Sequence, residues 1–132
     1  MHADVVARRI SGFSHEVDLG DGFEMVVDEP TEDGGGTGPR PTQLLAASLA
    51  GCTAITVELY AERKGWDVDG LEVAVEMDSD GGAITRFTVE VALPDGLDDE
   101  QRRKLMVIAE KCPVHRLLVH GAEITVAERA RA

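Results

Sequence analysis

The chain has 132 residues, of which 43% are hydrophobic and 29% charged, and its formal net charge is −12. This length and composition predict a single globular domain, residues 1–132, with a modest core. The acidic charge argues against nucleic acid or an anionic membrane as a partner, because both would repel the chain. We find no run of about 18 apolar residues and no signal-peptide pattern, so we expect no transmembrane span and a cytoplasmic location.

The N-terminal part predicts three short strands, at residues 3–10, 12–19 and 22–28. The segment Leu19-Gly20-Asp21-Gly22 is typical of a hairpin turn between the second and third strands. Residues 29–41 are too rich in glycine and proline for a helix or a strand, so they must form a loop. Loops of this length often have a function.

A long helix is expected next, capped by Thr42 and ending at about Lys64, before Gly65. Its first half is apolar nearly all round, which is typical of a helix buried on several sides. Two alternating strands, 71–77 and 87–93, follow as a hairpin with its turn at 79–82.

The C-terminal part predicts a helix from Asp98 to about Lys111 and a short second helix with Pro113 at its first position. A final strand is expected at residues 123–127. The order β-β-β-α-β-β-α-α-β indicates the α+β class.

The two cysteines of the chain stand in settings suited to redox chemistry. Cys112 lies where an N-cap belongs, and the helix dipole and exposed N–H groups there lower a thiol pKa. Cys52 lies in mid-helix, where the amides are already bonded, so its activation must come from residues that the fold brings in. The pattern favours a pair in which one thiol is oxidised and the other resolves it. The structural alternative is that each is a small buried hydrophobic residue.

Two motifs give the chain a resemblance to a known family. Residues 38–53, GPRPTQLLAASLAGCT, resemble the central-helix motif of the OsmC/Ohr family, and residues 112–116, CPVHR, resemble its second-cysteine motif. The order of elements also fits. The short N-terminus and the Gly-rich loop resemble the OsmC-like branch more than the organic hydroperoxide resistance proteins.

The resemblance implies an intertwined α+β homodimer, with long central helices packed between sheets and two active sites at the interface. It also implies thiol peroxidase chemistry without a metal or organic cofactor. Cys52 would attack an organic hydroperoxide and become a sulfenic acid. Cys112 would resolve it as a Cys52–Cys112 disulfide, which an external dithiol would reduce.

The activating pair of the family does not carry over to this sequence. The well-studied members have a glutamate about ten residues before the first cysteine, where this chain has Thr42, followed by Gln43. Their arginine motif is not recognisable either, and Arg40 is the nearest candidate. Arg40 and Gln43 are therefore candidate activating or substrate-contacting residues. Further arginine candidates are Arg8, Arg9 and Arg116.

Three functions follow from these residues. The first is a peroxidase that prefers organic hydroperoxides to hydrogen peroxide, because Cys52 has apolar surroundings. The second, which the missing glutamate motivates, is a non-catalytic ligand-binding or redox-sensing protein on the same fold. The third is metal binding through Cys52, Cys112 and His115, since the last two share a helical face. Tyr60 and Trp66 are expected to be packing residues.

Overall fold

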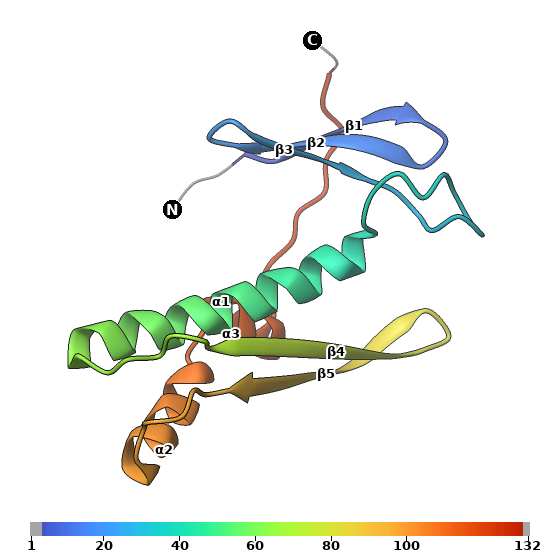
Figure 1. The fold of residues 1–132 in the computed structure, drawn as a ribbon. Coiled ribbons are helices and arrows are strands. Elements are labelled where there is room, and N and C mark those ends of the chain that lie inside the picture. The colour runs from blue at the N-terminus through green and yellow to red at the C-terminus, as the bar shows by residue number, and fades with distance from the viewer. Residues whose placement is uncertain (1–3, 131–132) are drawn as a thin grey trace. The chain divides into compact units, whose positions relative to one another are not determined.

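The computed structural model describes residues 4–130, which form two compact units, 4–47 and 48–130. In the first unit, β1 (Val6–Ser11), β2 (Ser14–Gly20) and β3 (Phe23–Val27) make an antiparallel sheet in that order (Figure 1). Asp21 and Gly22 have φ values of 54° and 84°, so the predicted β2–β3 hairpin turn is confirmed. Residue 3 of the strand expected at 3–10 lies outside the described residues.

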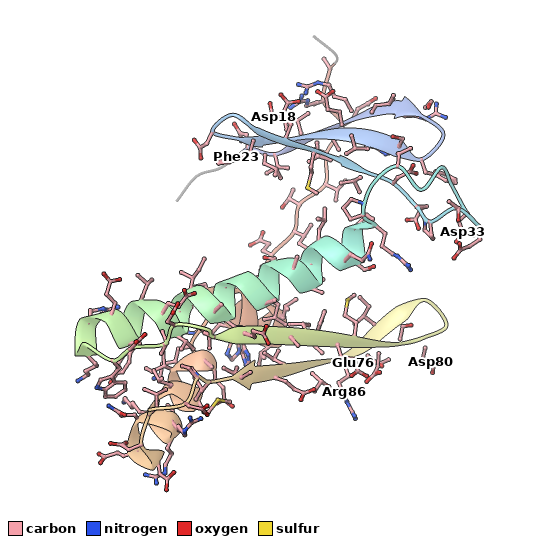
Figure 2. All side chains as sticks on the ribbon, viewed as in Figure 1. Asp18, Phe23, Asp33, Glu76, Asp80 and Arg86 are labelled. Carbon is pink, nitrogen blue, oxygen red and sulfur yellow. The ribbon has the colours of Figure 1, made fainter. Side chains whose placement is uncertain are left out.

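The loop after β3 is organised around the side chain of Asp28, which is only 2% exposed. One carboxylate oxygen accepts the Thr37 hydroxyl at 2.6 Å and the Thr37 N–H at 3.1 Å, and the other accepts the Glu29 N–H at 2.7 Å. The Asp28 N–H donates to the Pro39 carbonyl at 3.1 Å and so closes the base of the loop. Asp33 lies at the tip of this loop (Figure 2).

The glycines in this loop are needed for close approach. A Cβ at Gly35 would lie 3.0 Å from the Asp28 carboxylate, and a Cβ at Gly38 would collide with the Val26 carbonyl. The Gly-rich composition therefore lets the backbone wrap tightly around one buried charge.

Helix α1 (Pro41–Lys64) ends where the sequence predicts, but it begins at Pro41, so Thr42 lies inside its first turn and is not the predicted N-cap. It stops at Gly65, with φ of 72°, and the Trp66 N–H donates to the Ala61 carbonyl at 2.9 Å. An 18-residue window of α1 has a mean hydropathy of 1.6, so by length and composition it could cross a membrane, which corrects our expectation that no such segment exists. A core helix of a soluble protein has the same character, yet only 22% of this window is buried within the chain.

The rest of the second unit consists of a hairpin, two helices and the segment 121–130, which has no helix or strand (Figure 1). Strands β4 (Glu72–Asp80) and β5 (Ala83–Ala92) pair antiparallel as far as Asp80 and Ala83, so both extend closer to the turn than predicted. Helix α2 (Asp99–Ala109) has a capping box made by Asp98 and Gln101, and α3 (Pro113–His120) has Cys112 at its N-cap, as expected.

The core of this unit lies where α1 meets α2. Val57, Ala61, Leu105 and Ala109 are buried there. Val91 of β5 packs against them, together with apolar side chains from the end of α1 and from the segments that connect the elements. The Tyr60 and Trp66 rings pack edge to face with centroids 5.8 Å apart, so their expected packing role is confirmed.

The strand expected at 123–127 does not form in the described chain, where these residues run as unpaired backbone. Ile124 and Val126 are 83% and 91% exposed. The alternation of apolar and polar residues that predicted a strand is present, but a strand also needs a neighbouring backbone for its hydrogen bonds. Within residues 4–130, no segment supplies that neighbour.

The buried Asp28 carboxylate should make the stability of the protein depend on pH. Its hydrogen bonds with Thr37 lower the pKa of Asp28 below the ordinary value of 3.8, against the opposing effect of burial. A lowered folded-state pKa contributes stability above the ordinary pKa, and this contribution is lost as the pH falls through the folded value. We expect Asp28→Asn to lower the urea midpoint at pH 7, and the deficit to shrink below about pH 4.

Asp33→Asn is the matched control, because Asp33 lies exposed in the same loop. It should leave the urea midpoint at pH 7 unchanged. An Asp28→Asn deficit that stays constant from pH 7 to about pH 3 would rule out the charge of Asp28 as its cause.

Candidate active site: the Cys52–Cys112 pair

The fold brings the two cysteines together although sixty residues separate them. Cys52 lies in mid-α1 and Cys112 at the N-cap of α3, and their thiols are within hydrogen-bonding reach of each other. Both are unbridged, so the structure holds the dithiol state. Their exposure differs, because Cys112 is 0% exposed whereas Cys52 is only partly buried.

Cys112 is held by groups from two helices. Its sulfur accepts the backbone N–H of His115 at 3.5 Å, and the Thr53 hydroxyl of α1 is also within hydrogen-bonding reach. Burial raises the pKa of Cys112, but hydrogen bonds from the Cys52 thiol, the His115 N–H and the Thr53 hydroxyl outweigh it and bring the pKa below its ordinary value. The predicted influence of the helix N-terminus on this thiol agrees with this direction.

Cys52 shows the opposite trend. Burial raises the pKa of Cys52, and its hydrogen bond with Cys112 raises the pKa further. The Val114 N–H from the first turn of α3 acts against both effects. The Thr56 hydroxyl makes its 2.7 Å hydrogen bond to the Cys52 carbonyl oxygen, so we assign it no part in stabilising the thiolate. The groups from outside α1 that act on the Cys52 sulfur are Cys112 and the Val114 N–H, and together with burial they leave its pKa raised, so activation of Cys52 by the fold stays a prediction.

An apolar groove of about 360 Å³ lies beside the helices that hold the pair. Leu49 in its wall lies one helical turn before Cys52, and His115 lies one turn after Cys112. Arg86 supplies the cationic side chain of the groove from β5, where Figure 2 shows it. The remaining wall consists mainly of side chains of β5 and α3, namely Ile84, Thr85, Phe87, Val89, Leu118 and Val119.

Arg40 and Gln43 lie together at the start of α1. The Gln43 side-chain oxygen accepts the Arg40 backbone N–H at 2.9 Å, which caps the helix, and both residues are exposed. Gln43 therefore has a structural task at this end of α1. Their assignment as activating or substrate-contacting residues stays a prediction.

The metal-binding alternative gains no support from side-chain placement. Among the described residues, no three His, Cys, Asp or Glu side chains gather in a way that could hold a metal ion. The His115 contact with Cys112 is made by its backbone N–H rather than by its ring.

The chain is similar in sequence to known proteins. The family model described as OsmC-like protein matches residues 34–127, a span that includes both cysteines. The chain belongs to the OsmC-like family. An uncharacterized protein of Haloferax volcanii is 28% identical over 111 residues, which cover 81% of this chain and 80% of that protein.

Solved structures share the fold. An OsmC-like protein from Mycoplasma pneumoniae matches with a TM-score of 0.79 and 18% identity, over 92% of this chain and 89% of that one. The organic hydroperoxide resistance protein OhrB of Bacillus subtilis matches with a TM-score of 0.58 and 27% identity, over 92% of each chain. The predicted α+β OsmC-like fold is thus confirmed.

Sequence reasoning missed three parts of the site. These are the Thr53 hydroxyl, the Val114 N–H and the groove wall on β5. Thr53 adjoins Cys52 in the sequence, and its polar side chain in an apolar helix was a usable signal. The other two depend on how α3 and β5 pack, which no local pattern reveals.

Proposed function

We propose that this protein is a thiol-dependent peroxidase that reduces organic hydroperoxides and so takes part in defence against oxidative stress. The observation that carries the proposal is the pair of thiols within hydrogen-bonding reach, one partly exposed and the other fully buried. Only Cys52 is open to a substrate, so it is assigned the attack on peroxide. Cys112 is the resolving thiol. The family includes organic hydroperoxide resistance proteins, which supports this chemistry.

The proposed reaction has three steps. The Cys52 thiolate attacks the terminal oxygen of the hydroperoxide, the O–O bond breaks, and an alcohol leaves while Cys52 becomes a sulfenic acid. The Cys112 sulfur then attacks the Cys52 sulfur, and water leaves as the disulfide forms. An external dithiol reduces the disulfide by thiol–disulfide exchange. A cytoplasmic location, where such dithiols are available, belongs to the same proposal.

The site residues at the start of α1 belong to the proposal as well. Arg40 and Gln43 remain the candidates for contact with substrate or for support of the thiolate, because this chain has Thr42 where the well-studied family members have a glutamate. No catalytic step is assigned to either residue.

The first test is the intact mass of the reduced protein after one equivalent of cumene hydroperoxide. We expect rapid loss of two hydrogens, which is the mass change of disulfide formation. Cys112→Ser should instead gain one oxygen, because its sulfenic acid cannot be resolved, and Cys52→Ser should not react. Reaction of the wild type no faster than cysteine in solution would reject the peroxidase and favour the ligand-binding alternative.

The groove predicts the substrate class. Its apolar wall suits the organic part of a hydroperoxide, which hydrogen peroxide lacks. Val119→Asp places a charge on a wall residue that is 66% exposed, so the protein should still fold. We expect kcat/KM for cumene hydroperoxide to fall about tenfold, with little change for hydrogen peroxide.

Val107→Asp is the control for this experiment, because Val107 is 49% exposed on α2 and lies outside the groove. It should leave both rates unchanged. Equal losses for the two peroxides in Val119→Asp, or a wild type that consumes hydrogen peroxide as fast as the organic substrate, would exclude the groove as the substrate site.

The proposed partner of the chain is a second copy of itself. Gly51, Ile55 and Leu59 follow one another at four-residue intervals along α1, and the two larger side chains are 58% and 52% exposed. A Cβ at Gly51 would meet nothing within 4 Å, although glycine in mid-helix costs about 1 kcal/mol relative to alanine. A stripe of this kind suits close packing against another helix.

We expect sedimentation analysis to show a dimer for the wild type and a monomer for Ile55→Asp, because the charge would be buried in the helix interface. Val107→Asp serves again as the control and should remain dimeric. A monomeric wild type would contradict the homodimer directly.

A further inference from the structure

A second cavity of the C-terminal unit lies between the end of α1 and α2. It has a volume of about 650 Å³ and shares no lining residue with the groove beside the cysteine pair. Its wall includes two aromatic and three cationic side chains, namely Tyr60, Trp66, Lys64, Arg103 and Lys104. The proposed thiol chemistry uses none of these residues, so the cavity calls for a function of its own.

Two ammonium groups share the ring of Tyr60 in this cavity. Lys64 Nζ, one helical turn further along α1, lies over the ring at 5.6 Å from its centroid. Lys104 Nζ comes from α2 and lies at 5.7 Å from the same centroid. Each ammonium group is attracted by the ring, but the two positive charges repel each other. An anion bound beside both of them would replace this repulsion by attraction.

The cations of the cavity are not neutralised by the protein itself. Within residues 4–130, the contacts with the Tyr60 ring are the only polar or charged interactions of Lys64 and Lys104, and Arg103 has no hydrogen bond or ion pair. The chain has 25 acidic residues against 13 basic ones, yet no carboxylate is paired with these three side chains. Their charges are therefore available to a bound anion.

The same cavity has an aromatic wall. The Trp66 ring packs edge to face on the Tyr60 ring with centroids 5.8 Å apart, and both residues are half-buried. Two rings that hold each other in place form a rigid apolar surface, which suits contact with a flat group of a ligand. Aromatic side chains beside cationic ones are a general means of binding a planar ring that carries a phosphate.

Two carboxylates also border the cavity and restrict where an anion can lie. The Asp98 carboxylate accepts the Gln101 N–H at 2.8 Å in the capping box of α2, so it is committed to the helix end. Glu100 is exposed, one turn before Lys104. These acidic groups disfavour an anion at the N-terminus of α2. The place for an anion is beside the two ammonium groups that lie over the Tyr60 ring.

We propose that this cavity binds a small molecule in which a phosphate group is joined to a planar ring, the chemistry shared by mononucleotides and aryl phosphates. The phosphate contacts Lys64, Lys104 and Arg103, and the ring contacts Trp66. A phosphate monoester carries about two negative charges at pH 7 and three acceptor oxygens, which suits three cationic side chains better than a single carboxylate does. The net charge of −12 repels anions at long range, so binding depends on this local cluster.

The test uses the fluorescence of Trp66, which is the only tryptophan of the chain. AMP and phenyl phosphate are titrated into the full-length reduced protein, and calorimetry detects binding that leaves the fluorescence unchanged. We expect saturable binding of at least one of the two monoesters. Tighter binding of AMP identifies the mononucleotide class, and tighter binding of phenyl phosphate identifies the aryl phosphate class. Absence of saturable binding of both compounds by both methods would overturn the proposal.

Adenosine and inorganic phosphate separate the two parts of the ligand. Adenosine and phenol keep a ring without the phosphate, and inorganic phosphate keeps the charge without the ring. Each should bind at least tenfold more weakly than the better monoester, measured directly or by displacement of that monoester. Inorganic phosphate that displaces the monoester at equal concentration would exclude the aromatic part of the site, and a ring compound that binds equally well would exclude the phosphate part.

Lysine variants locate the site. Lys64→Ala and Lys104→Ala should each weaken binding of the better monoester about tenfold, because each removes a charge-assisted hydrogen bond to the phosphate. Both residues are exposed, so the variants should fold, and circular dichroism checks this. Arg63→Ala is the matched control, because Arg63 is exposed beside Lys64 in the sequence but does not line the cavity. It removes the same charge and should leave the affinity unchanged.

Equal losses of affinity in Arg63→Ala and in the lysine variants would show that binding follows the overall charge, and would exclude this cavity. The proposal goes beyond the peroxidase and does not depend on it. All of these measurements are made without peroxide, so their failure would leave the thiol chemistry untouched.

Discussion

The contact between the middle of α1 and the N-terminus of α3 is the interaction on which the candidate site depends. It places a partly exposed thiol and a buried thiol within hydrogen-bonding reach and directs backbone N–H groups of α3 at both sulfurs. Pro113 starts α3 immediately after Cys112, so the Cys112 sulfur stands at the N-terminus of that helix and accepts the His115 N–H.

The electrostatics of the pair depend on where each sulfur lies in its helix. In mid-helix the amides are already bonded, so α1 has no backbone donor for Cys52. The first turn of α3 has N–H groups without partners inside the helix. The His115 N–H donates to the Cys112 sulfur, and the Val114 N–H acts on the Cys52 sulfur. The interaction between the two thiols couples their ionisation, so their pKa values belong to the pair rather than to either residue.

Two features of the single chain favour the proposal that a second chain covers part of its surface. The apolar helix α1 leaves most of its hydrophobic surface uncovered, and the alternating segment at 123–127 has no strand to pair with among residues 4–130. Each of these segments has the apolar pattern of a buried helix or strand, but nothing within residues 4–130 covers it or pairs with it. A second copy of the chain is the proposed cover. The Asp28 loop is different, since its buried carboxylate is satisfied within its own unit.

The sequence by itself determined most of the local elements and the identity of the candidate reactive residues. Proline, glycine and capping residues set the ends of α1, α2 and α3, and strict alternation set β4 and β5, because these signals act over only a few residues. The two cysteine motifs also identified the family, which the family model then matched. Only the tertiary structure decided which thiol is buried, which donors each sulfur receives, and that Thr53 faces Cys112. Those properties arise from packing between segments far apart in the chain, and for the same reason a strand pattern at 123–127 could not predict whether a pairing partner exists.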